Sequence, residues 1–164
     1  MTAGRGIMHA EMPHHEQPDP KTGVVPPIVG MQLWVDLPQR LKKCEPRYRD
    51  LRASEIPRVT LDDGKVEVKI ISGQSHGVDS VQELAYTPVW LLDVLIKPGG
   101  SILQNLPKGW NAFAYTLEGN ATKFGTGKSE QVVKQYHNVV FEQAGDGIVA
   151  AVHATSKESS RFSK

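Results

Sequence analysis

The composition has little that points to a cross-linked, strongly charged or membrane-inserted protein. Cys44 is the only cysteine, so neither an intramolecular disulfide nor a thiolate zinc cluster is expected. Nineteen basic and eighteen acidic residues give a formal net charge of +1, and no long basic block indicates direct binding of nucleic acid. There is no apolar run of membrane-spanning length and no signal-peptide pattern. We expect a protein that is not secreted, does not enter membranes and resides in the cytoplasm or nucleus.

Turn-forming residues are plentiful, with fifteen glycines and eleven prolines in 164 residues. They separate short segments in which apolar and polar residues alternate, or in which apolar residues run together, and no long helix pattern is present. This organisation indicates an all-β sandwich or barrel. Strands are predicted at 30–37, 66–70, 89–96, 111–117, 139–141 and 148–152, a flexible loop at 14–27, and a frayed polar end at 156–164.

The predicted strand at 30–37 has two distinct faces. Met31 and Leu33 belong to one face, while Gln32 and Trp34 belong to the other. Side chains two residues apart in a strand point to the same side. This pattern is typical of a half-buried strand.

The triplet His9-Ala10-Glu11 is the part of the sequence with the clearest chemical interest. If residues 7–12 form a strand, His9 and Glu11 project to the same face. An imidazole beside a carboxylate suits a divalent ion such as iron, manganese, nickel or copper. The spacing alone also fits an exposed polar pair or a hydrogen-bonded histidine, and two ligands do not complete a metal site.

The other histidines offer weaker candidates. His14 and His15 lie in the proline-rich loop and are within reach of a metal, but adjacent residues of extended chain point in opposite directions. His76 precedes Gly77 and is interpreted as a turn residue. His137 and His153 are each isolated near predicted strand edges, so we do not expect them to bind a metal.

Several segments resemble the pirin family of the cupin superfamily. They are MTAGRGIMHAEMP at 1–13, GMQLWVDLP at 30–38, EPRYRDL at 45–51, VKIISG at 68–73 and LPKGWNAFAYTLEGNA at 106–121. The segments occur in the family's order and together cover most of the chain. The first two are the most specific, because chance agreement over such unusual stretches is small.

The resemblance implies a bicupin, with two jelly-roll β-barrels, and a monomer. Residues 1–60 would be the remainder of the N-terminal, metal-binding barrel with a loop insertion at 14–29. Residues 61–164 would be the C-terminal barrel, in which 96–106 lacks paired histidine ligands. The resemblance further implies that the family's chain extends past this sequence at both ends, so the N-terminal barrel would be incomplete.

The resemblance also implies one iron ion held by three histidines and one glutamate. His9 and Glu11 correspond to the last two ligands, and the other two belong to an upstream H-x-H segment that this sequence does not contain. The implied activity is that of a quercetin 2,3-dioxygenase, in which a flavonol-like aromatic substrate binds the iron and Glu11 acts as the base. The alternatives are an iron-dependent transcriptional co-regulator acting through protein partners and an inactive, metal-free fragment.

Overall fold

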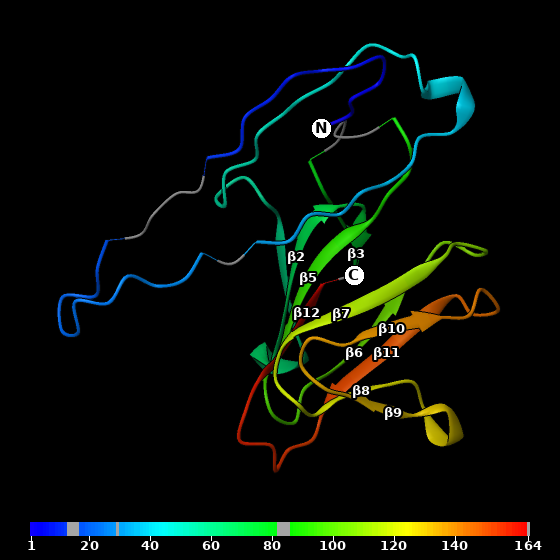
Figure 1. The fold of residues 1–164 in the computed structure, drawn as a ribbon. Coiled ribbons are helices and arrows are strands. Elements are labelled where there is room, and N and C mark those ends of the chain that lie inside the picture. Colours follow the sequence, from blue (N-terminus) through cyan, green and yellow to red (C-terminus); the bar gives the residue numbers. More distant parts are fainter. Residues whose placement is uncertain (13–16, 29, 82–85, 164) are drawn as a thin grey trace. The chain divides into compact units, whose positions relative to one another are not determined.

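The structure is a computed structural model that describes residues 1–12, 17–28, 30–81 and 86–163. The chain divides into two compact units, Met1–Tyr48 and Arg49–Lys164 (Figure 1). The first unit contains a short 3₁₀ helix, η1 (Gln39–Leu41), and the second contains η2 (Asp62–Gly64) and η3 (Gly127–Ser129). None of the described residues belongs to a helix long and apolar enough to cross a membrane.

The second unit is built from antiparallel strands. A six-stranded sheet has the order β1-β2-β5-β12-β7-β10, a four-stranded sheet has the order β6-β11-β8-β9, and β3 pairs with β4. The strands are β1 (Arg58–Leu61), β2 (Val66–Ser72), β3 (Gln74–Ser75), β4 (Val78–Asp79), β5 (Leu91–Ile96), β6 (Ser101–Asn105), β7 (Ala112–Glu118), β8 (Thr122–Phe124), β9 (Gln131–Val133), β10 (Asn138–Phe141), β11 (Gly147–Val152) and β12 (Ser160–Ser163).

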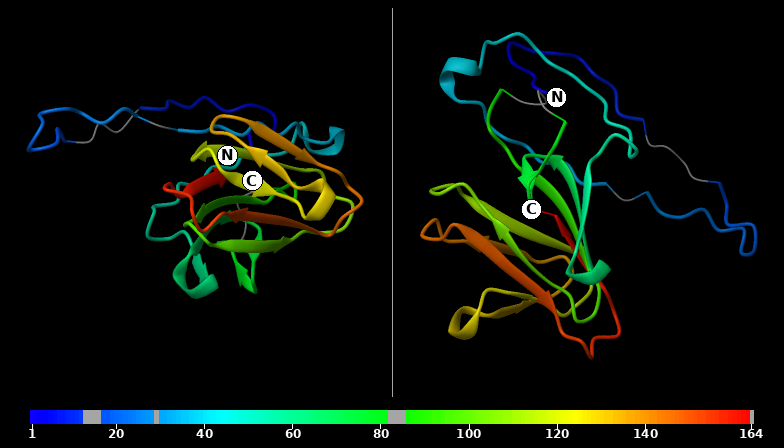
Figure 2. Two further views of the ribbon diagram at one scale, coloured as in Figure 1. Left: turned by 90° about the horizontal axis from the view of Figure 1, so that it is seen from below. Right: turned by 180° about the vertical axis from the view of Figure 1, so that it is seen from behind.

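The two larger sheets face each other over one apolar core (Figure 2). Val68 of β2 and Ala150 of β11 are both fully buried in it, although they belong to different sheets. Three aromatic rings pack against one another there. The ring of Phe124 lies 5.0 Å from that of Phe162 and 5.7 Å from that of Phe141, centroid to centroid, in edge-to-face geometry. The result is the all-β jelly roll that the sequence predicted.

Five of the six predicted strands are confirmed. The alternation at 66–70 gives β2, whose Val66, Val68 and Ile70 are completely buried. The continuous apolar run at 89–96 gives β5, which is largely buried on both faces, as expected. The segments at 111–117, 139–141 and 148–152 correspond to β7, β10 and β11.

The inward face of β7 carries small residues. Ala114 and Thr116 are completely buried, whereas Phe113 on the opposite face is 38% exposed. The reason lies in the neighbouring strand, because Phe162 pairs in register with Thr116. A second large side chain on the inner face of β7 would compete with the aromatic rings for the same space.

The prediction of a frayed C-terminus is wrong, because 160–163 form a central strand. β12 pairs with β5 on one side and with β7 on the other. Ser160 and Phe162 are buried, and the Ser160 hydroxyl hydrogen-bonds to Thr122 of the four-stranded sheet. Phe162 is the single aromatic residue in this polar segment. Its burial in the core therefore stabilises the segment as a strand.

The strands predicted in the first unit are also absent from the described residues. Neither 7–12 nor 30–37 forms a strand, and the unit's described backbone holds one isolated bridge, between Thr2 and Arg47. A strand needs a hydrogen-bonded neighbour as well as an alternating sequence. The alternation persists in the exposure of 30–37, where Leu33 is 39% exposed and Trp34 is 85% exposed.

A chain of charges crosses the outer face of the six-stranded sheet. The guanidinium group of Arg161 on β12 donates two hydrogen bonds to Asp93 on β5, of 2.8 and 2.7 Å. Lys69 on β2 contributes a third contact to Asp93, at 3.2 Å, and Arg161 also approaches Glu118 on β7, at 3.5 Å. Burial alone would raise the pKa of Asp93, but the hydrogen bond and charge of Arg161, aided by Lys69, hold that pKa below its ordinary value.

Replacing Phe162 tests the role of β12. We expect Phe162→Ala to lower the free energy of unfolding by about 3–5 kcal/mol, because the ring leaves a cavity between the sheets. Phe113→Ala is the matched control on the outer face and is expected to cost about 1 kcal/mol. Urea unfolding curves measure both, and equal losses in the two variants would contradict the assigned packing.

The Asp93 network predicts a specific dependence of stability on pH. Because the folded state lowers the pKa of Asp93, its contribution is complete above the unfolded value of 3.8 and is lost as the pH falls through the folded value. Asp93→Asn should therefore lower stability at pH 7 and flatten the decline below about pH 4. Urea unfolding at several pH values measures this, with Glu130→Gln, which breaks an exposed pair with Lys123, as the control. Parallel curves for Asp93→Asn and the wild type would refute the network.

Candidate metal centre

The N-terminal segment of the first unit is held against residues 44–47 by backbone hydrogen bonds. Thr2 and Arg47 exchange two such bonds, and the Arg5 amide donates to the Cys44 carbonyl at 3.0 Å. Gly4 lies between them with φ +51°, and a Cβ atom there would overlap the Cys44 carbonyl oxygen. Only glycine fits this close approach, so the glycine of the opening motif fixes the path of the chain that leads to His9.

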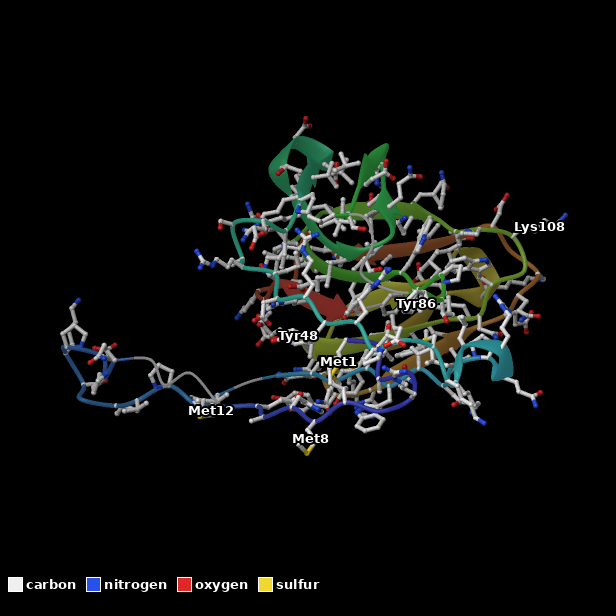
Figure 3. All side chains as sticks on the ribbon, turned by 90° about the horizontal axis from the view of Figure 1, so that it is seen from above. Met1, Met8, Met12, Tyr48, Tyr86 and Lys108 are labelled. Atoms are coloured by element: carbon white, nitrogen blue, oxygen red, sulfur yellow. The ribbon has the colours of Figure 1, made fainter. Side chains whose placement is uncertain are left out.

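His9 and Glu11 lie side by side. The Nε2 atom of His9 is 3.6 Å from Oε1 of Glu11, and their side chains are 41% and 66% exposed. The neighbouring Met8 and Met12 project into solvent, at 98% and 89% exposed (Figure 3). The prediction that His9 and Glu11 share one side of the chain therefore agrees with the geometry, although their segment is not a strand.

Two residues that the sequence did not single out as functional join this pair. The side-chain amide of Gln32 donates a hydrogen bond of 2.8 Å from Nε2 to Oε1 of Glu11. Trp34 in turn donates from its indole Nε1 to Oε1 of Gln32, at 2.9 Å. The alternation at 30–37 had already placed Gln32 and Trp34 on the same face, which is consistent with the hydrogen bond between them.

The distance between His9 and Glu11 fits two ligands of one ion. Ligand nitrogen and oxygen atoms lie about 2.1 Å from a divalent transition metal, so two atoms on the same ion are at most about 4.2 Å apart. The 3.6 Å separation satisfies this limit. No group of three or more histidine, cysteine, aspartate or glutamate side chains with metal-binding geometry occurs among the residues that the structure describes. His14 and His15 lie outside the described residues.

Each of the other described histidines has a polar contact with a residue near it in sequence. His76 has a positive φ of 49° in the turn between β3 and β4, as predicted, and its Nδ1 atom lies 3.0 Å from the Ser75 hydroxyl. Nδ1 of His137 is 2.9 Å from the Gln135 carbonyl oxygen. Nδ1 of His153 is 2.8 Å from the Thr155 hydroxyl. Each of these contacts is local and involves no second metal-binding side chain.

The interior of the β-sandwich has a different chemical character. Among the described residues, its buried polar side chains are those of serine, threonine and Gln104, apart from the carboxylate of Asp93, which bonds to Arg161 on the outer face. Gln104 accepts a hydrogen bond of 2.7 Å from the Ser75 hydroxyl. The segment at 96–106, where a cupin metal site would contribute ligands, forms the end of β5, a turn and β6. The candidate metal ligands His9 and Glu11 therefore belong to the first unit.

Comparison with a solved structure defines the class of fold. The chain is similar to quercetin 2,3-dioxygenase from Acinetobacter baumannii with a TM-score of 0.65 and 19% identity, over 79% of this chain and 42% of that one. At this identity the likeness concerns the fold alone. The protein is a cupin-type jelly roll.

Curated relatives resemble nearly the whole chain. The chain is 38% identical to Pirin-1 of Arabidopsis thaliana over 162 residues, which is 99% of this chain and 51% of the relative. It is 37% identical to human Pirin over 99% of this chain and 50% of that protein. No protein-family model matches the chain. The chain is therefore similar to pirins over nearly its whole length, and it spans about half the length of the curated relatives that it matches.

Proposed function

We propose that this chain is part of an iron-binding pirin and that His9 and Glu11 supply two of the iron ligands. The observation that carries the proposal is the 3.6 Å approach of His9 Nε2 to Glu11 Oε1 within the motif that resembles the family's ligand segment. One neutral imidazole and one carboxylate are donors that iron(II) accepts. The remaining donors would come from residues outside the described part of this chain, including His14, His15 or a further polypeptide segment.

We further propose a dioxygenase reaction of the quercetin 2,3-dioxygenase type on a flavonol-like aromatic substrate. Iron, when bound, supplies a site at which a chelating substrate and dioxygen meet. The similarity of fold to a quercetin 2,3-dioxygenase supports this activity, as does the family's pattern at His9 and Glu11. A reducing compartment, the cytoplasm or nucleus, suits a chain with one cysteine.

Glu11 has the second role in this proposal, as the general base. Its contacts with described residues engage Oε1, which faces both His9 and Gln32. Oε2 is then the oxygen that would accept the proton of a substrate hydroxyl. His9 would bind the metal through Nε2, the ring nitrogen that points toward Glu11. Trp34, 85% exposed beside this pair, adds an aromatic surface at the same place.

Iron content tests the ligand assignment. Purified from iron-supplied cells, the protein should contain about one iron per chain, and His9→Ala should retain less than about a tenth of it, because the ion has lost its imidazole donor. His153→Ala is the matched control, since that imidazole has a local partner, the hydroxyl of Thr155. Iron and protein are measured in the same samples. A wild-type protein without iron would refute the proposal and favour the inactive, metal-free alternative.

Oxygen uptake tests the base. With quercetin as substrate, Glu11→Gln should lower kcat per bound iron by about 10²–10⁴-fold, since the amide cannot accept the substrate proton. KM should change much less, because substrate chelation does not require the base. Glu45→Gln, which alters an exposed pair with Arg5 in the same unit, should leave turnover unchanged. Undiminished turnover in Glu11→Gln would remove the general-base role.

A further inference from the structure

The contacts of Gln32 form a directed chain of hydrogen bonds that ends on Glu11. Trp34 donates to Gln32 at 2.9 Å, and Gln32 donates to Glu11 at 2.8 Å. The first two residues belong to the segment at 30–37, while Glu11 is 21 residues away from Gln32 in sequence. The chain of bonds therefore joins two separate segments of the first unit at the carboxylate.

The chemistry of the three groups fixes the direction of this chain. An indole N–H can only donate a hydrogen bond, and an ionised carboxylate can only accept one. An amide placed between them satisfies both partners in a single orientation, with its oxygen toward Trp34 and its nitrogen toward Glu11. Trp34 thus determines which end of the Gln32 amide faces Glu11.

The hydrogen bond from Gln32 reaches the oxygen of Glu11 that also faces His9. A bond between a neutral donor and an ionised acceptor is stronger than a neutral pair, and it restricts rotation of the carboxylate. With Oε1 held between Gln32 and His9, the carboxylate keeps one oxygen beside the imidazole and turns the other away. Glu11 is 66% exposed, so its neighbours provide little packing that would otherwise restrain it.

We infer that Gln32 is a positioning residue for Glu11 and that Trp34 sets the orientation of the Gln32 amide. This inference rests on the proposed function of His9 and Glu11 as iron ligands. Outer residues that orient a metal ligand typically change metal affinity by about 10–100-fold when they are replaced. Gln32 acts through Glu11 and is not itself a ligand.

Four variants separate the parts of this arrangement. Gln32→Leu removes the amide, and Gln32→Glu keeps an acceptor for Trp34 while replacing the donor with a second negative charge beside Glu11. Trp34→Phe keeps the aromatic ring and removes the indole donor. Gln39→Leu alters an amide of η1 in the same unit and serves as the control.

The first readout uses the metal-free protein. In ¹⁵N–¹H NMR spectra, Glu11→Gln should shift both the Gln32 side-chain amide signals and the Trp34 indole signal, whereas Glu45→Gln should leave them unchanged. Trp34→Phe should likewise shift the Gln32 signals. Unchanged Gln32 signals in Glu11→Gln would overturn the inference without reference to any metal.

The second readout is the affinity for Fe²⁺ alone, titrated without oxygen. Gln32→Leu should weaken binding by about 10–100-fold, Trp34→Phe should weaken it less, and Gln39→Leu should match the wild type. Gln32→Glu should weaken binding as well, because its carboxylate cannot donate to Glu11. Urea midpoints should be equal in all variants, which separates positioning from loss of fold.

The outcomes distinguish the positioning role of Gln32 from the ligand role of His9 and Glu11. Tight Fe²⁺ binding by the wild type with equal affinity in Gln32→Leu would overturn the positioning role and leave the ligand assignment intact. A wild-type protein that does not bind Fe²⁺ would overturn the ligand assignment, and the positioning role with it. Loss of affinity in Gln32→Leu but not in Gln39→Leu supports both.

Discussion

The insertion of β12 between β5 and β7 is the contact on which the second unit depends. Its four residues pair with β5 and three of them also pair with β7, and without this strand the six-stranded sheet would divide between β5 and β7. From the same strand, Phe162 packs in the core against Phe124. On the outer face, Arg161 donates a hydrogen bond to Asp93. One short segment therefore supplies sheet continuity, interior packing and the central charge of the outer network.

This arrangement leaves the sandwich interior filled with side chains suited to packing. Phenylalanine rings and aliphatic residues make up the core, and two pairs of buried polar side chains bond within each pair, Ser75 with Gln104 and Thr122 with Ser160. In the first unit, by contrast, the described segments make few regular backbone pairs, and the polar side chains of His9, Glu11 and Gln32 meet instead. The division agrees with a protein in which one part is a scaffold and the other carries the proposed chemistry.

Strands could be predicted from the sequence where their own pattern of apolar and polar residues shows which face is buried. Val66, Val68 and Ile70 alternate cleanly and are completely buried, so β2 could be identified from spacing alone. β12 could not, because its burial depends on a gap between two strands that are far away in sequence. The opposite error occurred at 30–37, where a clear alternation has no hydrogen-bonded partner strand among the described residues.

In the candidate site, too, only the contact between neighbouring residues could be predicted from the sequence. The spacing of His9 and Glu11 was enough to predict that they lie together, because both are in one short segment. The link from Gln32 to Glu11 joins residues 21 positions apart, and no local pattern specifies that contact. The resemblance to pirins identified the segments involved, whereas the direction of the hydrogen-bond chain follows only from the side-chain geometry.

X-ray absorption at the iron K-edge is the most direct measurement of the central claim, that His9 and Glu11 bind iron. Binding by these residues should give a shell of nitrogen and oxygen donors with the outer-shell scattering of imidazole, and His9→Ala should lose part of that imidazole signal. Identical spectra for the wild type and His9→Ala, measured at equal iron concentration, would show that His9 is not an iron ligand.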